Sequence, residues 1–283
     1  MITLTKSYLP QEVLRLPQPP KQLYVSSDVL DKLIKEPRIA IVGSRKVSPY
    51  GRAVTTKFAS ELAGKGVVVV SGLALGVDSI AHQSVLQAKG TTIAVLPSGL
   101  DKIYPVSHTQ LAHQITGSHG LLVTEYPKGT EPYPMNFVAR NRIIASLAEA
   151  VLITEAAVNS GSLHTARYAL ELGIPVLAVP GPITSPTSEG TNNLIKAGAT
   201  PVTSLEDIFA ALNWQLTDKK SSDIHANSEP ERIILEVLRS GQSDGHELLR
   251  SSKLEAQVFN QALTMLEITG RIRPLGNNHW QSI

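Results

Sequence analysis

The chain contains no cysteine, which excludes disulfide bonds, thiolate catalysis and cysteine-ligated zinc. No apolar run approaches the roughly 20 residues of a membrane-spanning helix, and the first residues show no basic segment followed by an apolar one. The formal net charge is only +2, too small to make the whole surface attractive to a polyanion. These absences predict a cytoplasmic protein with no membrane partner, in which any nucleic-acid contact depends on locally placed groups.

Apolar and charged residues occur in the proportions of a globular protein, and their order is regular along residues 37–214. Apolar residues make up 42% of the 283 residues and charged residues 18%. Short continuous apolar runs alternate there with amphipathic segments, which is typical of parallel strands covered by helices on both faces. The expected strands are residues 38–42, 67–70, 92–96, 121–124, 151–154 and 175–179. The pattern predicts a doubly wound parallel α/β domain.

Three further segments precede or follow this domain. Residues 1–36 are rich in proline and predict an extended lead-in with one short helix, and residues 215–228 lack an apolar period and predict a linker. Residues 229–283 carry three helical patterns and a hairpin, which favours a small winged-helix domain. Its third expected helix, within residues 255–269, has no basic residue. Protein contact or a cap on the α/β domain is therefore favoured over duplex reading.

Three of the expected strands lead into turns of small residues. These turns are Gly43-Ser44-Arg45 after the first strand, Ser71-Gly72 at the end of the second, and Ser160-Gly161-Ser162 after the fifth. The carboxyl ends of parallel strands share one edge of the sheet, where glycine-rich turns and helix N-termini can hold phosphates. The turns together predict a groove for a nucleotide or nucleic acid, although each one alone also fits an ordinary strand-to-helix turn.

Two arginines flank an asparagine close to the start of an expected helix over residues 139–148. Cations such as Arg140 and Arg142 are unfavourable at the positive end of a helix unless an anion binds there. Phosphate contact explains this placement, and so does structural pairing with a nearby carboxylate, Glu125 or Glu155; the sequence leaves both open. Phe137 precedes them and is a ring on which an unpaired base could stack, or an ordinary residue at the edge of the core.

Groupings that suggest catalysis or metal binding are incomplete. Asp78 and His82 are four residues apart on an expected helix, but no third metal ligand accompanies them, and a helix cap with a local hydrogen bond explains them as well. Ser162 and His164 lack the G-x-S-x-G turn of a hydrolase nucleophile. The sequence therefore predicts no catalytic residue, no metal site and no cofactor.

The last helix expected in the α/β domain carries one apolar stripe. Leu205, Ile208, Phe209 and Leu212 follow the spacing i, i+3, i+4 and i+7. Packing on its own domain explains the first two, while the rest of the stripe fits a twofold partner. We expect a homodimer whose interface includes Ile208, Phe209 and Leu212.

Seven segments, in order across residues 37–200, carry a family resemblance. They are IVGSRKVSPYG, SGLALGVDSIAH, TIAVLPSGLDKIYP, GLLVTEYPKG, FVARNRIIASLAEAVLITEA, NSGSLHTARYALELGIPVLAVPG and EGTNNLIKAGA. Together they closely resemble the DNA-processing protein A family, also known as DprA or Smf. The resemblance is specific because no single short pattern has to support it.

This resemblance implies an extended Rossmann-like domain that binds single-stranded DNA and passes it to the RecA recombinase in natural transformation or recombination, acting as a homodimer. It also implies which residues form the DNA groove, to which the arginine pair described above adds Arg142. By their numbers in this sequence, the expected residues are Gly43, Ser44, Arg45, Arg52, Ser71, Gly72, Phe137, Arg140, Asn141, Arg142, Ser160, Gly161, Ser162 and Lys196.

An enzyme is the competing class. Related Rossmann-like proteins split nucleoside monophosphates into base and ribose phosphate, and they rely on a P-G-G-x-G-T turn followed by a catalytic glutamate. This chain has Pro180-Gly181-Pro182 and, further on, Ser188-Glu189-Gly190-Thr191 instead. The departure favours binding over phosphoribohydrolase activity.

Overall fold

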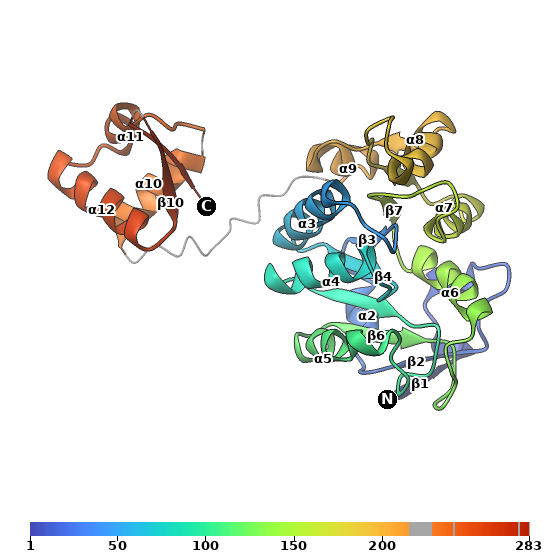
Figure 1. Ribbon diagram of the computed structural model, residues 1–283. Coiled ribbons are helices and arrows are strands. Elements are labelled where there is room, and N and C mark those ends of the chain that lie inside the picture. Colours follow the sequence, from blue (N-terminus) through green and yellow to red (C-terminus); the bar gives the residue numbers. More distant parts are fainter. Residues whose placement is uncertain (215–227, 240, 277, 283) are drawn as a thin grey trace. The chain divides into compact units, whose positions relative to one another are not determined.

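The computed structural model describes residues 1–214, 228–239, 241–276 and 278–282 (Figure 1). The chain divides into two compact units, Met1–Leu216 and Thr217–Ile283, and each has a hydrophobic core of its own. The linker expected over residues 215–228 lies, apart from its last residue, outside the described part of the chain.

Unit 1 is built on a nine-stranded sheet with the strand order β1-β2-β6-β5-β4-β3-β7-β8-β9. The strands are β1 (Ile2–Thr5), β2 (Gln22–Val25), β3 (Arg38–Val42), β4 (Val68–Ser71), β5 (Thr92–Val95), β6 (Leu121–Thr124), β7 (Ala150–Ile153), β8 (Val176–Ala178) and β9 (Thr200–Pro201). From β6 to β9 every neighbouring pair is parallel. The chain runs outward from β3 to β6, then returns to the other side of β3 with β7. The strand order therefore reverses between β3 and β7, where open α/β sheets bind their ligands.

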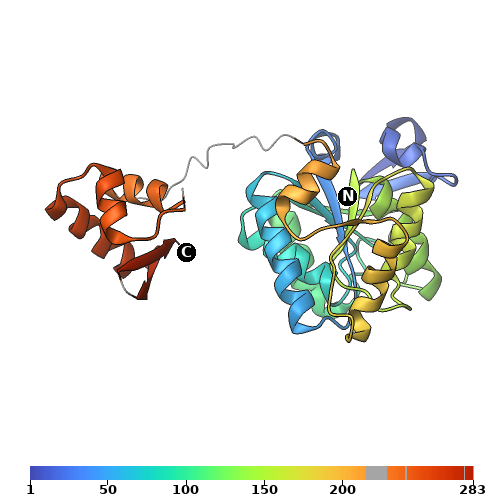
Figure 2. The same cartoon turned by 90° about the horizontal axis from the view of Figure 1, so that it is seen from above.

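Helices cover both faces of this sheet. They are α1 (Gln11–Leu14), α2 (Leu30–Leu33), α3 (Pro49–Gly64), α4 (Val77–Gln87), α5 (Thr109–Gly117), α6 (Pro134–Ser146), α7 (Ser162–Glu171), α8 (Glu189–Lys196) and α9 (Leu205–Ala211). Figure 2 shows α3 and α4, in blue to cyan, on one side of the strands and α6 and α7, in green to yellow, on the other. Side chains of β3 alternate accordingly: Ile39 and Ile41 join the core under α3 and α4, whereas Ala40 and Val42 join the core under α6 and α7. The predicted α/β fold with a mostly parallel, doubly covered sheet is confirmed.

The N-terminal segment contributes more structure than its sequence indicates. Residues 1–36 include β1 and β2, an antiparallel pair, and β2 continues the main sheet by pairing antiparallel with β6. Leu23 and Val25 are buried in the same core as α6 and α7. These residues therefore form an edge of the sheet and not an extended lead-in. The sequence shows no local pattern for them, because β1 and β2 pair about twenty residues apart and β2 pairs with β6 about a hundred residues further along the chain.

The start of α6 also differs from expectation. The helix begins at Pro134, which occupies the first helical turn, and not near residue 139. Arg140 and Arg142 therefore lie in the middle of the helix, so the argument that an anion must neutralise cations at its N-terminus does not apply.

Unit 2 contains the three expected helices and the hairpin. These are α10 (Glu229–Arg239), α11 (Gly245–Ser252), α12 (Ala256–Ile268), β10 (Ile272–Gly276) and β11 (His279–Ser282). Its core gathers Ile234, Leu248, Phe259 and Leu266. The winged-helix assignment stays a prediction.

None of the helices in the described ranges combines the length and apolar character that crossing a bilayer requires.

Candidate nucleic-acid interface

A cavity of about 700 Å³ opens where the strand order reverses. Its walls come from the turn after β3, the turn after β7, the start of α4 and the middle of α6. Nine of the fourteen residues expected in the groove line it: Gly43, Ser44, Arg45, Phe137, Arg140, Asn141, Ser160, Gly161 and Ser162. The structure brings these residues together, and their contact with DNA stays a prediction.

The turn after β3 is held by backbone contacts on two sides. The Ser44 amide donates to the carbonyl oxygen of Glu155 (2.7 Å), and the Ser44 carbonyl accepts from the amide of Val77 (3.1 Å). Gly76 approaches this turn with φ at 82°, and a Cβ there would collide with the Ser44 carbonyl. Arg45 follows at the surface and forms no ion pair with any residue of the described ranges. The turn thus presents a free cation on a fixed backbone.

Glu155 supports the turn from beneath, a role that the sequence analysis missed. Its carboxylate is 1% exposed and accepts hydrogen bonds from the amide and hydroxyl of Ser48 and from Thr187 Oγ1 (2.8 Å). Ser48 is also the N-cap of α3 and accepts from the Gly51 amide at 3.1 Å. One buried carboxylate therefore joins the turn after β3, the start of α3 and the segment before α8. The sequence did contain a signal for this role, because Glu155 is an acidic residue directly after a buried strand.

The turn after β7 ends at the N-terminus of α7. Gly161 is the N-cap and has no side chain to cap the helix. The first amides are engaged within the turn itself: the Ser162 amide donates to Ser160 Oγ (3.5 Å) and the Leu163 amide to the Ser160 carbonyl (3.1 Å). The hydroxyls of Ser160 and Ser162 lie 2.8 Å apart, and Asn141 Nδ2 donates to the Gly161 carbonyl (3.2 Å). Two hydroxyls at the positive end of a helix are suited to an anion.

Arg140 lies in the cavity wall but is only 3% exposed. Its Nη1 donates to the carbonyls of Gly72 (2.6 Å) and Val95. Burial lowers the pKa of Arg140 to about 10, while the neighbouring Asp78 carboxylate opposes this decrease. The guanidinium is therefore charged at neutral pH and supports the turn after β4, where a Cβ on Gly72 would approach it within 2.6 Å.

Arg142 forms the structural pair with a carboxylate that the sequence left open as the alternative to phosphate contact. Its Nη2 donates to Glu125 Oε2 at 2.6 Å, and both side chains are mostly buried. Arg142 does not line the cavity. The structural ion pair, and not phosphate contact, describes this arginine.

Phe137 combines with Arg45 at the cavity. The Arg45 guanidinium lies over the Phe137 ring, 5.1 Å from its centroid. Phe137 also meets Tyr104 edge to face, with ring centroids 5.3 Å apart. An aromatic ring and the cation that lies over it thus belong to one cavity lining, which also includes the N-terminus of α7.

Four other expected residues lie outside the cavity lining. Ser71 is fully buried and donates to the Ile41 carbonyl (2.6 Å), and Gly72 backs onto the guanidinium of Arg140. Arg52 is exposed in the first turns of α3, and Lys196 is the exposed last residue of α8. Ser71 and Gly72 therefore support the turn after β4, and the two cations lie exposed on separate helices, outside the cavity lining.

Asp78 and His82 do not form a pair. Asp78 accepts from the Gly72 amide (3.0 Å), and burial raises its pKa. His82 Nδ1 lies 2.7 Å from Thr92 Oγ1, and burial lowers its pKa to about 3. Across the described residues, no group of three metal-ligating side chains exists.

The apolar stripe of α9 packs on its own unit. Ile208 is fully buried and Phe209 is 6% exposed, both within the core under α3 and α4. Leu212 is only partly buried against that core. Of the three residues expected at a dimer interface, Leu212 alone retains surface for a partner.

Comparison with known proteins identifies the family of this chain. The family model of DNA recombination-mediator protein A matches residues 1–213. Protein Smf of Escherichia coli (strain K12) is 43% identical over 216 residues, which are 76% of this chain and 57% of that protein. DNA processing protein DprA of Bacillus subtilis (strain 168) is 41% identical over 203 residues, 71% of this chain and 68% of that protein.

Two solved structures are similar as well. DprA from Streptococcus pneumoniae matches with a TM-score of 0.69 and 37% identity, covering 74% of this chain and 73% of that one. DprA from Helicobacter pylori, described for its single-stranded DNA binding mode, matches with a TM-score of 0.67 and 36% identity, covering 75% and 95%. The chain spans only 57% to 61% of the length of Smf and of the Mycobacterium tuberculosis relative. By the family model and these identities, the chain belongs to the DNA recombination-mediator protein A family, the family of DprA and Smf.

Proposed function

We propose that this protein binds single-stranded DNA in the cavity between β3 and β7. The observation that carries the proposal is the combination of an aromatic ring, a cation and the serine hydroxyls at the N-terminus of α7 in one cavity. A nucleotide presents the complementary groups, because its base stacks on a ring and its phosphate accepts from hydroxyls and a guanidinium at the positive end of a helix. The Helicobacter pylori relative, which is described for binding single-stranded DNA, supports the same ligand.

The size of the cavity favours a single strand over a duplex. Cavities of about 300–1,000 Å³ hold one drug-sized ligand, and a nucleotide falls in that range. Stacking on Phe137 requires a base whose face is free, which a paired and stacked base does not offer. Sequence-tolerant binding follows, because every base has an aromatic face and the other groups meet the phosphates.

Hydrolysis of a nucleotide is not favoured by the residues present. Among the described residues that line the cavity, Asp78 is the sole carboxylate, and it is engaged by the Gly72 amide. Glu189 precedes Gly190-Thr191, whereas the catalytic glutamate of the phosphoribohydrolases follows the turn. Glu189 is also exposed on α8 and does not line the cavity. We therefore propose a binding protein and not an enzyme.

Delivery of the strand to a recombinase completes the proposal. The family resemblance supports hand-over to RecA during natural transformation or recombination, by a homodimer in the cytoplasm. At the end of α9, Ala210 and Asn213 are exposed and Leu212 is partly buried, which leaves surface for a twofold partner. Light scattering of the wild-type chain and of Leu212→Glu tests the dimer, and a dimer that Leu212→Glu leaves intact would exclude this surface.

Fluorescence anisotropy with labelled single-stranded and duplex DNA tests the central proposal. We expect tighter binding of the single strand, with a slope of log K against log salt of about −2 to −3.5 for three to five neutralised phosphates. Arg45→Ala should weaken binding by about 1.5–3 kcal/mol through loss of a charge-assisted contact. Arg167→Ala, an exposed arginine of α7 paired with Glu171, is the matched control and should bind like the wild type. Equal affinity for duplex and single strand would refute the proposal.

A further inference from the structure

Tyr104 is an exposed aromatic residue directly beside the ring that lines the cavity. It follows β5 in the chain, is 44% exposed, and lies outside the lining of the cavity itself. Its ring centroid is 5.3 Å from that of Phe137, and the two ring planes make an angle of 77°. The aromatic surface therefore continues from the cavity toward the β5 side of the sheet edge.

The loop that carries Tyr104 is held by hydrogen bonds at both ends. Before Tyr104, the Gly99 amide donates to the Thr130 carbonyl (3.0 Å) and Asp101 accepts from the Gly129 amide (2.9 Å). After it, His108 Nδ1 lies 2.8 Å from the Leu73 carbonyl, in the turn after β4. A ring on a loop fixed in this way loses little conformational freedom when a ligand stacks on it.

The angle between the two rings restricts what can stack on them. A base parallel to the Phe137 ring and a base parallel to the Tyr104 ring would themselves be nearly perpendicular. Neighbouring bases in a duplex, or in a stacked single strand, are parallel to each other. The step between the two rings is therefore open only to a strand that unstacks at that point, and thymidine runs unstack more readily than adenosine runs.

We propose that Tyr104 takes the base next to the one on Phe137, so that two successive bases are splayed apart, and that this step selects flexible, pyrimidine-rich single strands. The proposal rests on the proposed function of the same site. It adds a specificity-determining residue and a preference among single strands that phosphate contacts alone do not create.

Affinities for oligo-dT and oligo-dA of equal length test this proposal in the full chain. The wild type should prefer oligo-dT. Tyr104→Ala should weaken oligo-dT binding by about 5- to 150-fold, the range for loss of one stacked base, and should reduce the preference over oligo-dA. Tyr104→Phe keeps the ring and should retain both properties.

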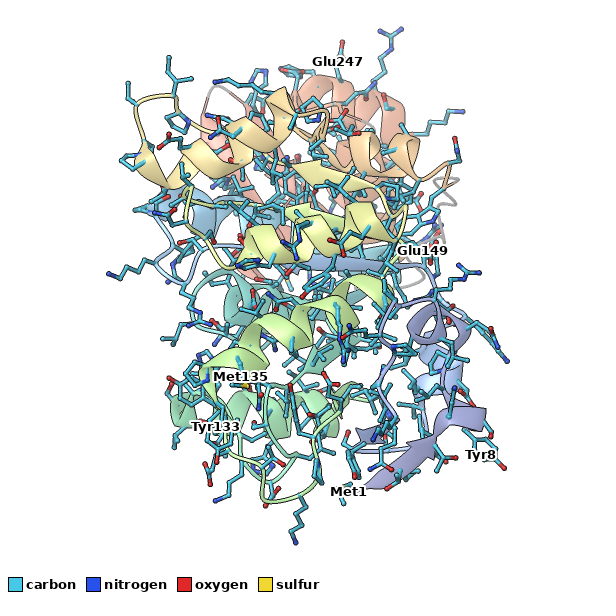
Figure 3. All side chains as sticks on the ribbon, turned by 90° about the vertical axis from the view of Figure 1, so that its right-hand side faces the viewer. Met1, Tyr8, Tyr133, Met135, Glu149 and Glu247 are labelled. Carbon is cyan, nitrogen blue, oxygen red and sulfur yellow. The ribbon has the colours of Figure 1, made fainter. Side chains whose placement is uncertain are left out.

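Tyr8→Ala is the matched control. Tyr8 is 73% exposed and lies beside the N-terminal strands, away from Tyr133 and Met135 at the start of α6 (Figure 3). It should bind both oligonucleotides like the wild type. Melting temperatures equal to that of the wild type establish that each variant is folded.

A scan with one abasic position in a short oligo-dT separates stacking from mere support of Phe137. In the wild type, two adjacent positions should be sensitive to loss of the base, and in Tyr104→Ala only one. Two sensitive positions in Tyr104→Ala, or wild-type affinity of that variant, would overturn the role of Tyr104 and leave the proposed function standing. A wild-type chain that binds no single strand would overturn both.

Discussion

Replacing Arg140 by methionine should lower the stability of unit 1 strongly and change its surface little. The change removes two charge-assisted hydrogen bonds, to the carbonyls of Gly72 and Val95, each worth about 1.5–3 kcal/mol. It also leaves the buried carboxylate of Asp78 without its neighbouring cation. Asp78 and Arg140 are neighbouring buried charges and form no direct ion pair, so the two lost hydrogen bonds account for most of the effect. We expect the free energy of unfolding to fall by about 3–5 kcal/mol.

Urea unfolding followed by circular dichroism measures this loss. Arg45→Ala is the control: Arg45 is exposed and unpaired, so its replacement should change stability by no more than about 0.5 kcal/mol. Adding Asp78→Asn to Arg140→Met should recover part of the loss, because the second change removes the carboxylate left uncompensated. An unfolding midpoint of Arg140→Met equal to that of the wild type would refute the structural role of this arginine.

Three further predictions concern pH, backbone geometry and the unit boundary. Burial lowers the pKa of His82 from 6.5 to about 3, so the unfolded chain gains a proton below pH 6.5 that the folded chain does not. In urea titrations, the difference in unfolding free energy between wild type and His82→Gln should therefore shrink by about 2 kcal/mol from pH 8 to pH 5. A difference that stays constant over this pH range would contradict the prediction. Gly76→Ala forces a side chain toward the Ser44 carbonyl at positive φ and should lower the stability by about 1–3 kcal/mol, measured by thermal unfolding. Gly64→Ala, with open space around it, is the control and should have the stability of the wild type. Similar losses of stability in both variants would exclude the steric reason. A chain ending at Trp214 should keep wild-type affinity for single-stranded DNA in anisotropy titrations, and loss of most affinity in a folded truncation would assign a share of binding to unit 2.

The parts of the fold that follow from local pattern could be predicted, and those that depend on distant pairing could not. Continuous apolar runs revealed the parallel strands because such strands are buried on both faces. The strands β1 and β2 escaped notice because they are not continuous apolar runs and are stabilised by antiparallel pairing with each other and with β6. The start of α6 was missed because its first turn, from Pro134, carries no apolar period, although proline at that position is itself a start signal.

The residues of the candidate site also include some that local pattern predicts and some that only tertiary packing determines. The small-residue turns were predictable because parallel strands deliver their carboxyl ends to one edge, as at Gly43 and Gly161. The roles of the two arginines were not, because tertiary packing decides that Arg140 points at two carbonyls and Arg142 at a carboxylate. The contribution of Glu155 depends on three segments distant in sequence, which no local pattern connects.

The buried carboxylate of Glu155 affects how binding defects in this protein should be interpreted. A Cβ on Gly43 would approach the Glu155 carbonyl within 2.6 Å, and one on Gly51 would collide with the carboxylate itself. Substitutions at these positions should shift the turn after β3, where we propose that a phosphate binds, without removing any group that would contact it. A screen for loss of DNA binding would therefore recover Gly51 and Glu155 alongside Arg45. Separating such scaffold variants from contact variants requires a stability measurement on each, since the affinity alone reports both.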